Sequence, residues 1–217
     1  MGRRGISFEL VIMHISEGVL SGPVLLSGAA LAAAGTAVGL KKLDYDHIAR
    51  TGMLSGVFFI ASLVHVPLGP ASVHLIMNGL IGLLLGWTAF PAILVALALQ
   101  AVFFQFGGIT SLGVNTVIMA LPAVVCSCLF APLLRRARPL ALTAAFACGF
   151  LAVGFGGIIV GLALMLTEEK FFEVAAAVLA AHLPVMIIEG IVTALCVAFL
   201  KKVQPSMLPG YSPKEVS

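Results

Sequence analysis

Long apolar runs, each near the length of a bilayer crossing and separated by a few polar residues, occupy almost all of this 217-residue chain. A helix that crosses a bilayer needs about 20 mostly apolar residues. The runs cover residues 19–40, 51–68, 73–87, 91–104, 114–134, 139–166 and 174–200. Because 61% of the residues are hydrophobic and only 10% are charged, no stretch is polar enough to form a separate soluble domain. We therefore predict an all-α, polytopic membrane helix bundle.

The two short runs, 73–87 and 91–104, are nearer the length of re-entrant or half-span segments than of full helices, and a single long helix kinked at Pro91 is a competing interpretation. The basic residues favour seven helices, with the N-terminus outside and the C-terminus inside, since cytoplasmic loops carry an excess of Lys and Arg. This topology places Lys41, Lys42, Arg50, Arg135, Arg136, Arg138, Lys201, Lys202 and Lys214 inside, and Arg3, Arg4 and Lys170 outside. Outer loops are expected near residues 67–72 and 105–113.

Several function classes are not expected from this sequence. The small net charge of +3 reflects topology rather than a nucleic-acid surface. The sequence has no P-loop, G-x-S-x-G or H-E-x-x-H motif and too few carboxylates for a paired acid/base site, so an enzyme is not expected. The cysteines lack C-x-x-C spacing and are predicted to be small buried hydrophobic residues: Cys126, Cys128, Cys148 and Cys196.

Polar residues in such an apolar chain are informative, because an ionisable group at membrane depth is costly and usually lines a cavity, pathway or protein contact. On the predicted topology they gather at or near the outer face: His14, Glu17, His65, His74, Asn78, Asn115, His182 and Glu189. A histidine-rich end suits a borderline divalent transition metal, whereas calcium or magnesium would need more carboxylates. His47 lies in a hydrophilic inner loop and is expected to be solvated.

Four blocks of sequence resemble the cobalt and nickel substrate-capture subunits of energy-coupling-factor (ECF) transporters, the CbiM/NikM family. The blocks are Met13–Ser21 with its Met-His-Ile start and acidic-Gly pair, Ser72–Leu80 with His74 and Gly79, Gly107–Thr116, and Ala181–Ala194. The resemblance covers residues 13 to about 205. It implies a prokaryotic inner-membrane subunit that binds Co²⁺ or Ni²⁺ as cargo, without a permanent cofactor. It also implies a transmembrane coupling subunit (CbiQ-like), ATP-binding subunits (CbiO-like) and a small accessory membrane subunit (CbiN-like) as partners.

The resemblance further implies a metal site built by the amino terminus. A free α-amine on Met13, the deprotonated amide nitrogen of His14 and the His14 imidazole form two fused chelate rings. By block position, His74 supplies the fourth nitrogen of a planar set, a geometry that Ni(II) and Cu(II) prefer. His65 is a less favoured ligand. Asn78 and Asn115 are expected either to orient a ligand histidine or to join helices.

Residues 1–12 depart from the family pattern, because they precede Met13 and a peptide-bonded amine cannot bind a metal. We expect a misassigned start, although removal of the segment or a different site are alternatives. The predicted organisation is an extension at 1–12, a transmembrane metal-binding domain at 13–205 and a cytoplasmic tail at 206–217. Phe106 is a second departure, because many family members have a polar residue or histidine there.

Two further polar features are assigned structural roles. Glu17 is expected to accept hydrogen bonds from backbone amides of the folded amino-terminal loop. His182 and Glu189 are seven residues apart on one helix face, where a polar lock between helices is favoured over a metal route. The main alternative function is a self-sufficient secondary carrier or channel for divalent cations, although no inverted repeat is evident.

Overall fold

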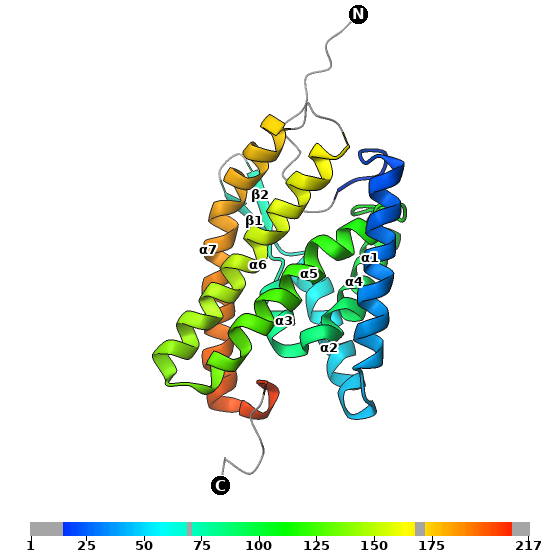
Figure 1. Cartoon of the computed structure of the whole chain (residues 1–217). Helices are drawn as coiled ribbons and strands as arrows, with labels where there is room; N and C mark the ends of the chain where they lie inside the picture. The colour runs from blue at the N-terminus through cyan, green and yellow to red at the C-terminus, as the bar shows by residue number, and fades with distance from the viewer. Residues whose placement is uncertain (1–14, 69–70, 168–171, 210–217) are drawn as a thin grey trace, which may run out of the picture.

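The computed structural model describes residues 15–68, 71–167 and 172–209, and for 65–68, 71–74 and 172–181 it describes the backbone only. In these residues the chain forms a helical bundle with one two-stranded hairpin (Figure 1). The helices are α1 (Gly22–Lys41), α2 (Tyr45–Ala61), α3 (Asn78–Leu85), α4 (Ala89–Phe104), α5 (Leu112–Phe130), α6 (Arg138–Met165) and α7 (Phe172–Val203). Short 3₁₀ turns follow at Gly86–Thr88, Ala131–Arg135 and Pro205–Met207. The predicted helical bundle is confirmed.

The antiparallel hairpin of β1 (His65–Leu68) and β2 (Ala71–His74) is a feature that the apolar pattern did not reveal. The predicted second segment, 51–68, was wrong at both ends, because α2 begins at Tyr45 and ends at Ala61. The side chain of Asp44 caps this helix by accepting from the His47 N–H at 3.1 Å. The His47 ring also bonds to Asp44 and lowers the pKa of that carboxyl. His47 is exposed, as expected for a solvated histidine.

The chain breaks between α3 and α4 at Gly86, not at Pro91, which lies inside the first turn of α4. Gly86 has a φ of 56°, a value that L side chains rarely adopt. Asn78 contacts Met119, and Gly82 abuts Ala123, so α3 runs parallel to α5. α4 runs parallel to α2, because the Ser55 hydroxyl donates to the Ala92 carbonyl and the Gln100 amide donates to the Ser62 hydroxyl. Since α2 and α5 point in opposite directions, the chain reverses at the break.

Five segments of the described chain are long and apolar enough to cross a membrane. They are Gly22–Lys41, Asn78–Phe104, Leu112–Arg135, Arg138–Met165 and His182–Val203. α2 has 17 residues and α3 has 8. The segment Asn78–Phe104 combines α3 and α4, although the chain reverses its direction between them. An eight-residue helix is about 12 Å long, less than half of a hydrocarbon core about 30 Å thick. α3 is therefore a half-length helix.

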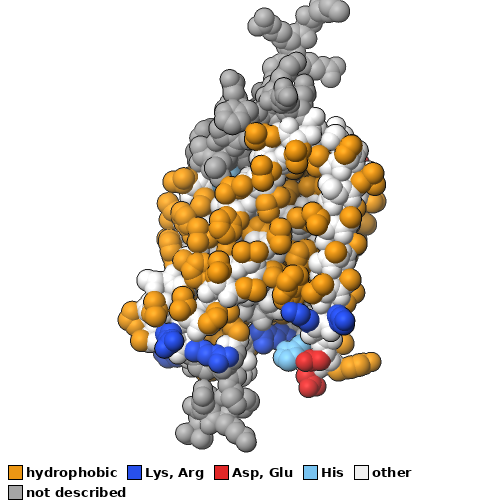
Figure 2. All heavy atoms as spheres, in the orientation of Figure 1, with side chains coloured by type: hydrophobic (Ala, Val, Ile, Leu, Met, Phe, Trp, Pro, Cys, Tyr) orange, Lys and Arg blue, Asp and Glu red, His pale blue; other side chains and the backbone are white. Residues whose placement is uncertain are grey.

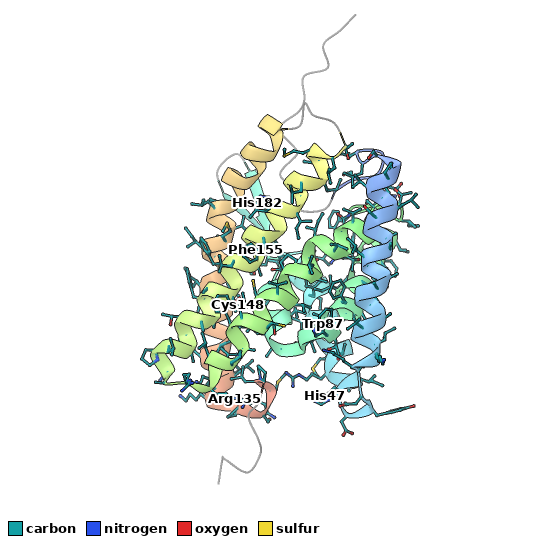
Figure 3. The ribbon with its side chains drawn as sticks, in the orientation of Figure 1. His47, Trp87, Arg135, Cys148, Phe155 and His182 are labelled. Carbon is teal, nitrogen blue, oxygen red and sulfur yellow. The ribbon has the colours of Figure 1, made fainter. Side chains whose placement is uncertain are left out.

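Basic side chains of the described residues gather at one end of the bundle, which we call the basic end (Figure 2). This end carries Lys41, Lys42, Arg50, Arg135, Arg136, Arg138, Lys201 and Lys202. The hairpin, residues 15–21 and residues 105–111 form the other end, which we call the hairpin end (Figure 1). His47 and Arg135 lie toward the basic end and His182 toward the hairpin end (Figure 3). An apolar belt separates the two ends.

Small residues let the central helices approach until their backbones touch, as the Ala/Gly bias of the sequence predicts. A Cβ added at Gly79 would meet the backbone of Gly149, and one at Gly82 would meet that of Ala123. A Cβ at Gly149 would meet Thr193 of α7. All four cysteines are free. Cys126 and Cys148 are buried as expected, whereas Cys128 is exposed and Cys196 is only half-buried, so the prediction was wrong for these two.

Candidate metal site at the hairpin end

The amino-terminal segment is fastened into the bundle at Ile15, which is only 6% exposed. The Ile15 N–H donates to Oδ1 of Asn115 at 2.9 Å, and Nδ2 of Asn115 donates back to the Ile15 carbonyl at 3.1 Å. This reciprocal pair satisfies both backbone groups of one buried residue. Met13 and His14 lie outside the described residues, but the chain position directly after His14 is held at the start of α5.

Glu17 makes a second attachment, to the 105–113 loop. Its N–H donates to the Gly107 carbonyl, and its Oε1 accepts from the Thr110 N–H, each at 3.1 Å. Glu17 accepts from a backbone amide, as expected, but this amide belongs to the 105–113 loop and not to the amino-terminal loop. Gly108 has a φ of 137°, and an added Cβ would meet the Glu17 side chain, so only glycine fits here. Phe106 of the same loop stacks on Phe104 and offers no metal-binding atom.

The hairpin brings two predicted site residues together, because His65 and His74 are register partners in the β1–β2 pair. Their side chains lie outside the described part of the structure. Directly opposed positions of an antiparallel pair share one face of the hairpin. The sequence did not reveal this pairing, although His65 and His74 are only nine residues apart. The strands follow an apolar run that is equally compatible with a helix.

Asn78 begins α3 four residues after His74 and is fully buried. Its Nδ2 donates to the carbonyls of Met119 at 3.3 Å and Ala152 at 3.5 Å. Its Oδ1 is buried and has no hydrogen-bond partner in the structure. A buried, unpartnered acceptor is costly, and it is available to a donor group that the described residues do not supply.

Both asparagines are attached to one stretch of α5. Asn115 belongs to this helix, and Asn78 of α3 donates to the carbonyl of Met119, which is about one turn after Asn115. Through them, α5 fixes both the chain next to His14 and the start of the helix that follows His74. The segments that carry the predicted ligands therefore converge near the first turns of α5.

Glu189 of α7 reaches the link between β2 and α3 and is fully buried. Its carboxylate accepts from the backbone N–H of Ile76 and, at 2.9 and 3.0 Å, from that of Met77. Met77 has a φ of 54°, so the link is not helical and these N–H groups have no helical acceptor. Such groups need a partner where water is absent. The expected polar lock is thus present at Glu189, although its partner is backbone rather than a side chain.

His182, also singled out from sequence, is buried at 2% exposure on the same helix. Within the described residues, no group of three or more His, Cys, Asp or Glu side chains is close enough to hold a metal ion. The predicted set of Met13, His14 and His74 falls outside the side chains described. What the structure provides is the scaffold around that set: Asn115, Asn78, Glu17 and Glu189.

The chain also matches a known protein family. Residues 14–207 match the family model CbiM, described as the cobalt uptake substrate-specific transmembrane region. The match begins at His14. It ends just beyond α7 and therefore includes every helix described above.

Individual proteins similar to this chain are also named for metal transport. The chain is 43% identical over 199 residues to a protein of Haemophilus influenzae named for metal transport, covering 90% of this chain and 97% of that one. It is 36% identical over 114 residues to the fused nickel transport protein NikMN of Rhodobacter capsulatus, covering 50% of this chain and 33% of that one. The crystal structure of a transition metal transporter superposes with a TM-score of 0.76 at 26% identity, covering 88% of this chain and 93% of that one.

Proposed function

Because the chain belongs to the CbiM family of cobalt and nickel transmembrane transport proteins, we propose that it is the substrate-binding subunit of an ECF-type uptake transporter. The observation that carries this proposal is the reciprocal pair of hydrogen bonds between Ile15 and Asn115. A ligand from another segment, such as His74, can complete the chelate only if the amino terminus is held near it, and Ile15 directly follows His14. The cargo is Co²⁺ or Ni²⁺.

In this proposal the metal is bound by the α-amine of Met13, the amide nitrogen and imidazole of His14, and the imidazole of His74. Each ring or amine nitrogen must be deprotonated to bind, so metal binding releases protons and weakens as the pH falls. A metal-bound imidazole usually donates its other N–H to a fixed acceptor. The buried Oδ1 of Asn78 is the unpartnered acceptor nearest to His74 in the chain. His65 is the alternative donor because it is the register partner of His74.

The proposed orientation has seven crossings, with the N-terminus outside and the C-terminus in the cytoplasm. It is supported by the basic end, since cytoplasmic loops collect Lys and Arg, and by the reversal at Gly86 between α3 and α4. Single cysteines at Gly69 and Ala137 in a cysteine-free protein should react with impermeant thiol reagents from opposite sides of the membrane. Labelling from the same side would contradict the orientation.

The proposed partners are a transmembrane coupling subunit and ATP-hydrolysing subunits, with a small accessory membrane subunit, in the inner membrane. Cells that express only this chain should accumulate little metal, and supplying the coupling and ATPase subunits should raise accumulation. Full uptake by the purified chain in liposomes without ATP would instead support a self-sufficient carrier.

The metal site is tested by isothermal titration of Co²⁺ and Ni²⁺ into purified protein that begins at Met13. His14→Ala should abolish high-affinity binding, His74→Ala should weaken it strongly, and His65→Ala should change it little. Insertion of one Ala between Met13 and His14 keeps every side chain but changes the chelate ring, so it should also abolish binding. Equal affinity in protein that retains residues 1–12 would show that the amine is not a ligand.

A further inference from the structure

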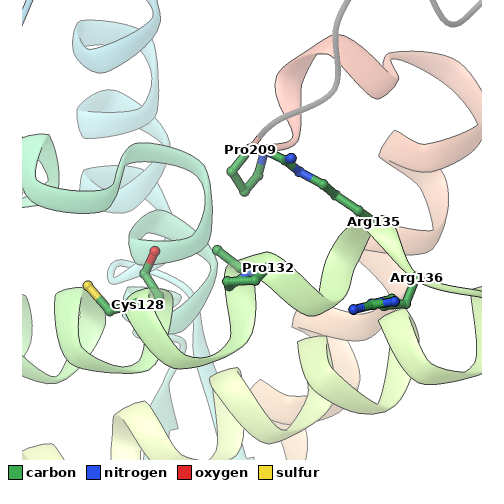
Figure 4. Close-up of a pocket in the computed structure, with 7 residues that line it drawn as sticks. Cys128, Pro132, Arg135, Arg136 and Pro209 are labelled. Carbon is green, nitrogen blue, oxygen red and sulfur yellow. The ribbon is translucent and has the colours of Figure 1, made fainter.

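A cavity of about 660 Å³ opens at the basic end, between the end of α5 and the turn into α6 (Figure 4). It is lined by Ser127, Cys128, Ala131, Pro132, Arg135, Arg136 and Pro209. In Figure 4, Arg135 extends toward Pro209, while Cys128 and Pro132 lie on the α5 side. The cavity is far from the hairpin end and takes no part in the proposed metal site.

Among residues 15–68, 71–167 and 172–209, neither the Arg135 nor the Arg136 guanidinium has a hydrogen-bond acceptor or a carboxylate partner, and both side chains are exposed. The sequence contains no Asp or Glu between Asp46 and Glu168. The second cavity at this end, about 360 Å³, differs because it holds Asp44 beside its basic residues. The larger cavity therefore presents net positive charge to a ligand.

The turn that bears these arginines is held in a fixed shape. Nζ of Lys201 donates to the carbonyl of Leu134 at 2.8 Å and to that of Arg136 at 3.3 Å. The Lys201 ammonium thus ties α7 to the turn while adding a third positive charge nearby. A rigid backbone reduces the ordering cost that a ligand of the two arginines would incur.

Apolar side chains border the same turn. Leu129, which precedes it, is 59% exposed, and Leu140, which follows it, is 47% exposed. A ligand that joins a phosphate to acyl chains would use both the cationic cavity and these exposed leucines, which lie within a few residues of it in the chain. Free phosphate or an acidic protein segment would use the arginines but not the leucines.

We propose that this cavity binds the headgroup of an anionic phospholipid, with Arg135 and Arg136 on its phosphate and the acyl chains along the leucines. Two guanidiniums give charge-assisted hydrogen bonds to phosphate oxygens. Basic pockets between transmembrane helices on the cytoplasmic side take such headgroups. The assignment of this lipid to the cytoplasmic leaflet depends on the orientation proposed above, whereas lipid binding in detergent does not. The lipid site and the proposed orientation can therefore be refuted independently.

The test is native mass spectrometry of the full chain in detergent, with phosphatidylglycerol, phosphatidylcholine or inorganic phosphate added. The wild type should retain phosphatidylglycerol in preference to phosphatidylcholine. Arg135→Ala/Arg136→Ala should bind phosphatidylglycerol roughly thirtyfold more weakly, because each basic side chain contributes several-fold to affinity for an anionic lipid. Arg138→Ala is the control, since it removes one nearby positive charge at the start of α6 that does not line the cavity, and it should retain the lipid.

Three outcomes would overturn the proposal. Equal retention of the two lipids by the wild type would remove the case for an anionic headgroup. Equal loss in Arg138→Ala would show only a diffuse charge effect. If inorganic phosphate displaced phosphatidylglycerol from the wild type at similar concentration, the ligand would be a free anion.

Discussion

Replacing Asn115 by alanine should uncouple the amino-terminal segment from the bundle. The change removes two hydrogen bonds to Ile15 and leaves a buried N–H and a buried carbonyl without partners. Each stranded buried group costs about 1–3 kcal/mol, so holding the segment in place should become about 2–6 kcal/mol less favourable. Because the metal binds only to the ordered segment, its apparent affinity should fall by a factor between about thirty and about twenty thousand.

The assay is isothermal titration of Ni²⁺ into purified Asn115→Ala, together with thermal unfolding of the metal-free protein. Thr116→Val is the matched control, since Thr116 is the next residue of α5 and its hydroxyl bonds only to the Leu112 carbonyl of its own helix. The control should lose some thermal stability but keep its metal affinity. If Asn115→Ala bound Ni²⁺ as tightly as Thr116→Val, the fastening at Ile15 would have no part in the site.

Two other substitutions test the scaffold. Glu189→Ala leaves the two backbone N–H groups ahead of α3 without an acceptor, so we expect a loss of about 2–5 kcal/mol in unfolding free energy. Glu189→Gln keeps an acceptor oxygen and should lose less than half as much. Equal losses for the two variants in denaturant titrations would refute this role of Glu189. Gly108→Ala combines a φ that alanine rarely adopts with contact on Glu17, so it should cost about 1–3 kcal/mol and weaken metal binding. Gly22→Ala is the control, because nothing lies within 4 Å of a Cβ added there, and it should change neither the unfolding free energy nor the metal affinity. Equal effects of Gly108→Ala and Gly22→Ala would refute the steric argument.

The sequence predicted most helices well, because long apolar stretches report bilayer crossings directly. The predicted segments 19–40 and 139–166 agree closely with α1 and α6. The prediction of α2 failed because its first turns carry Asp46 and Arg50, so the apolar pattern starts later than the helix does. The Arg50 guanidinium is accommodated there by the carbonyls of Leu84 and Met207.

The polar residues of the site were visible in sequence, but their partners were not. Asn115, Asn78 and Glu189 stood out because each interrupts an apolar run. Their partners are mostly backbone groups in distant segments, such as Ile15 and the Ile76–Met77 link. Any residue type supplies a backbone N–H or carbonyl, so no sequence pattern marks these partners. The convergence of the segments on α5 therefore required the structure.

The backbone contacts among the central helices determine which parts of the molecule can move. Where Gly79 meets Gly149 and Gly82 meets Ala123, no layer of side chains lies between the helices to slide or change rotamer. Shear between packed helices works by small side-chain adjustments, and such adjustments are absent at these crossings. α3, α5 and α6 should therefore move together as one rigid body.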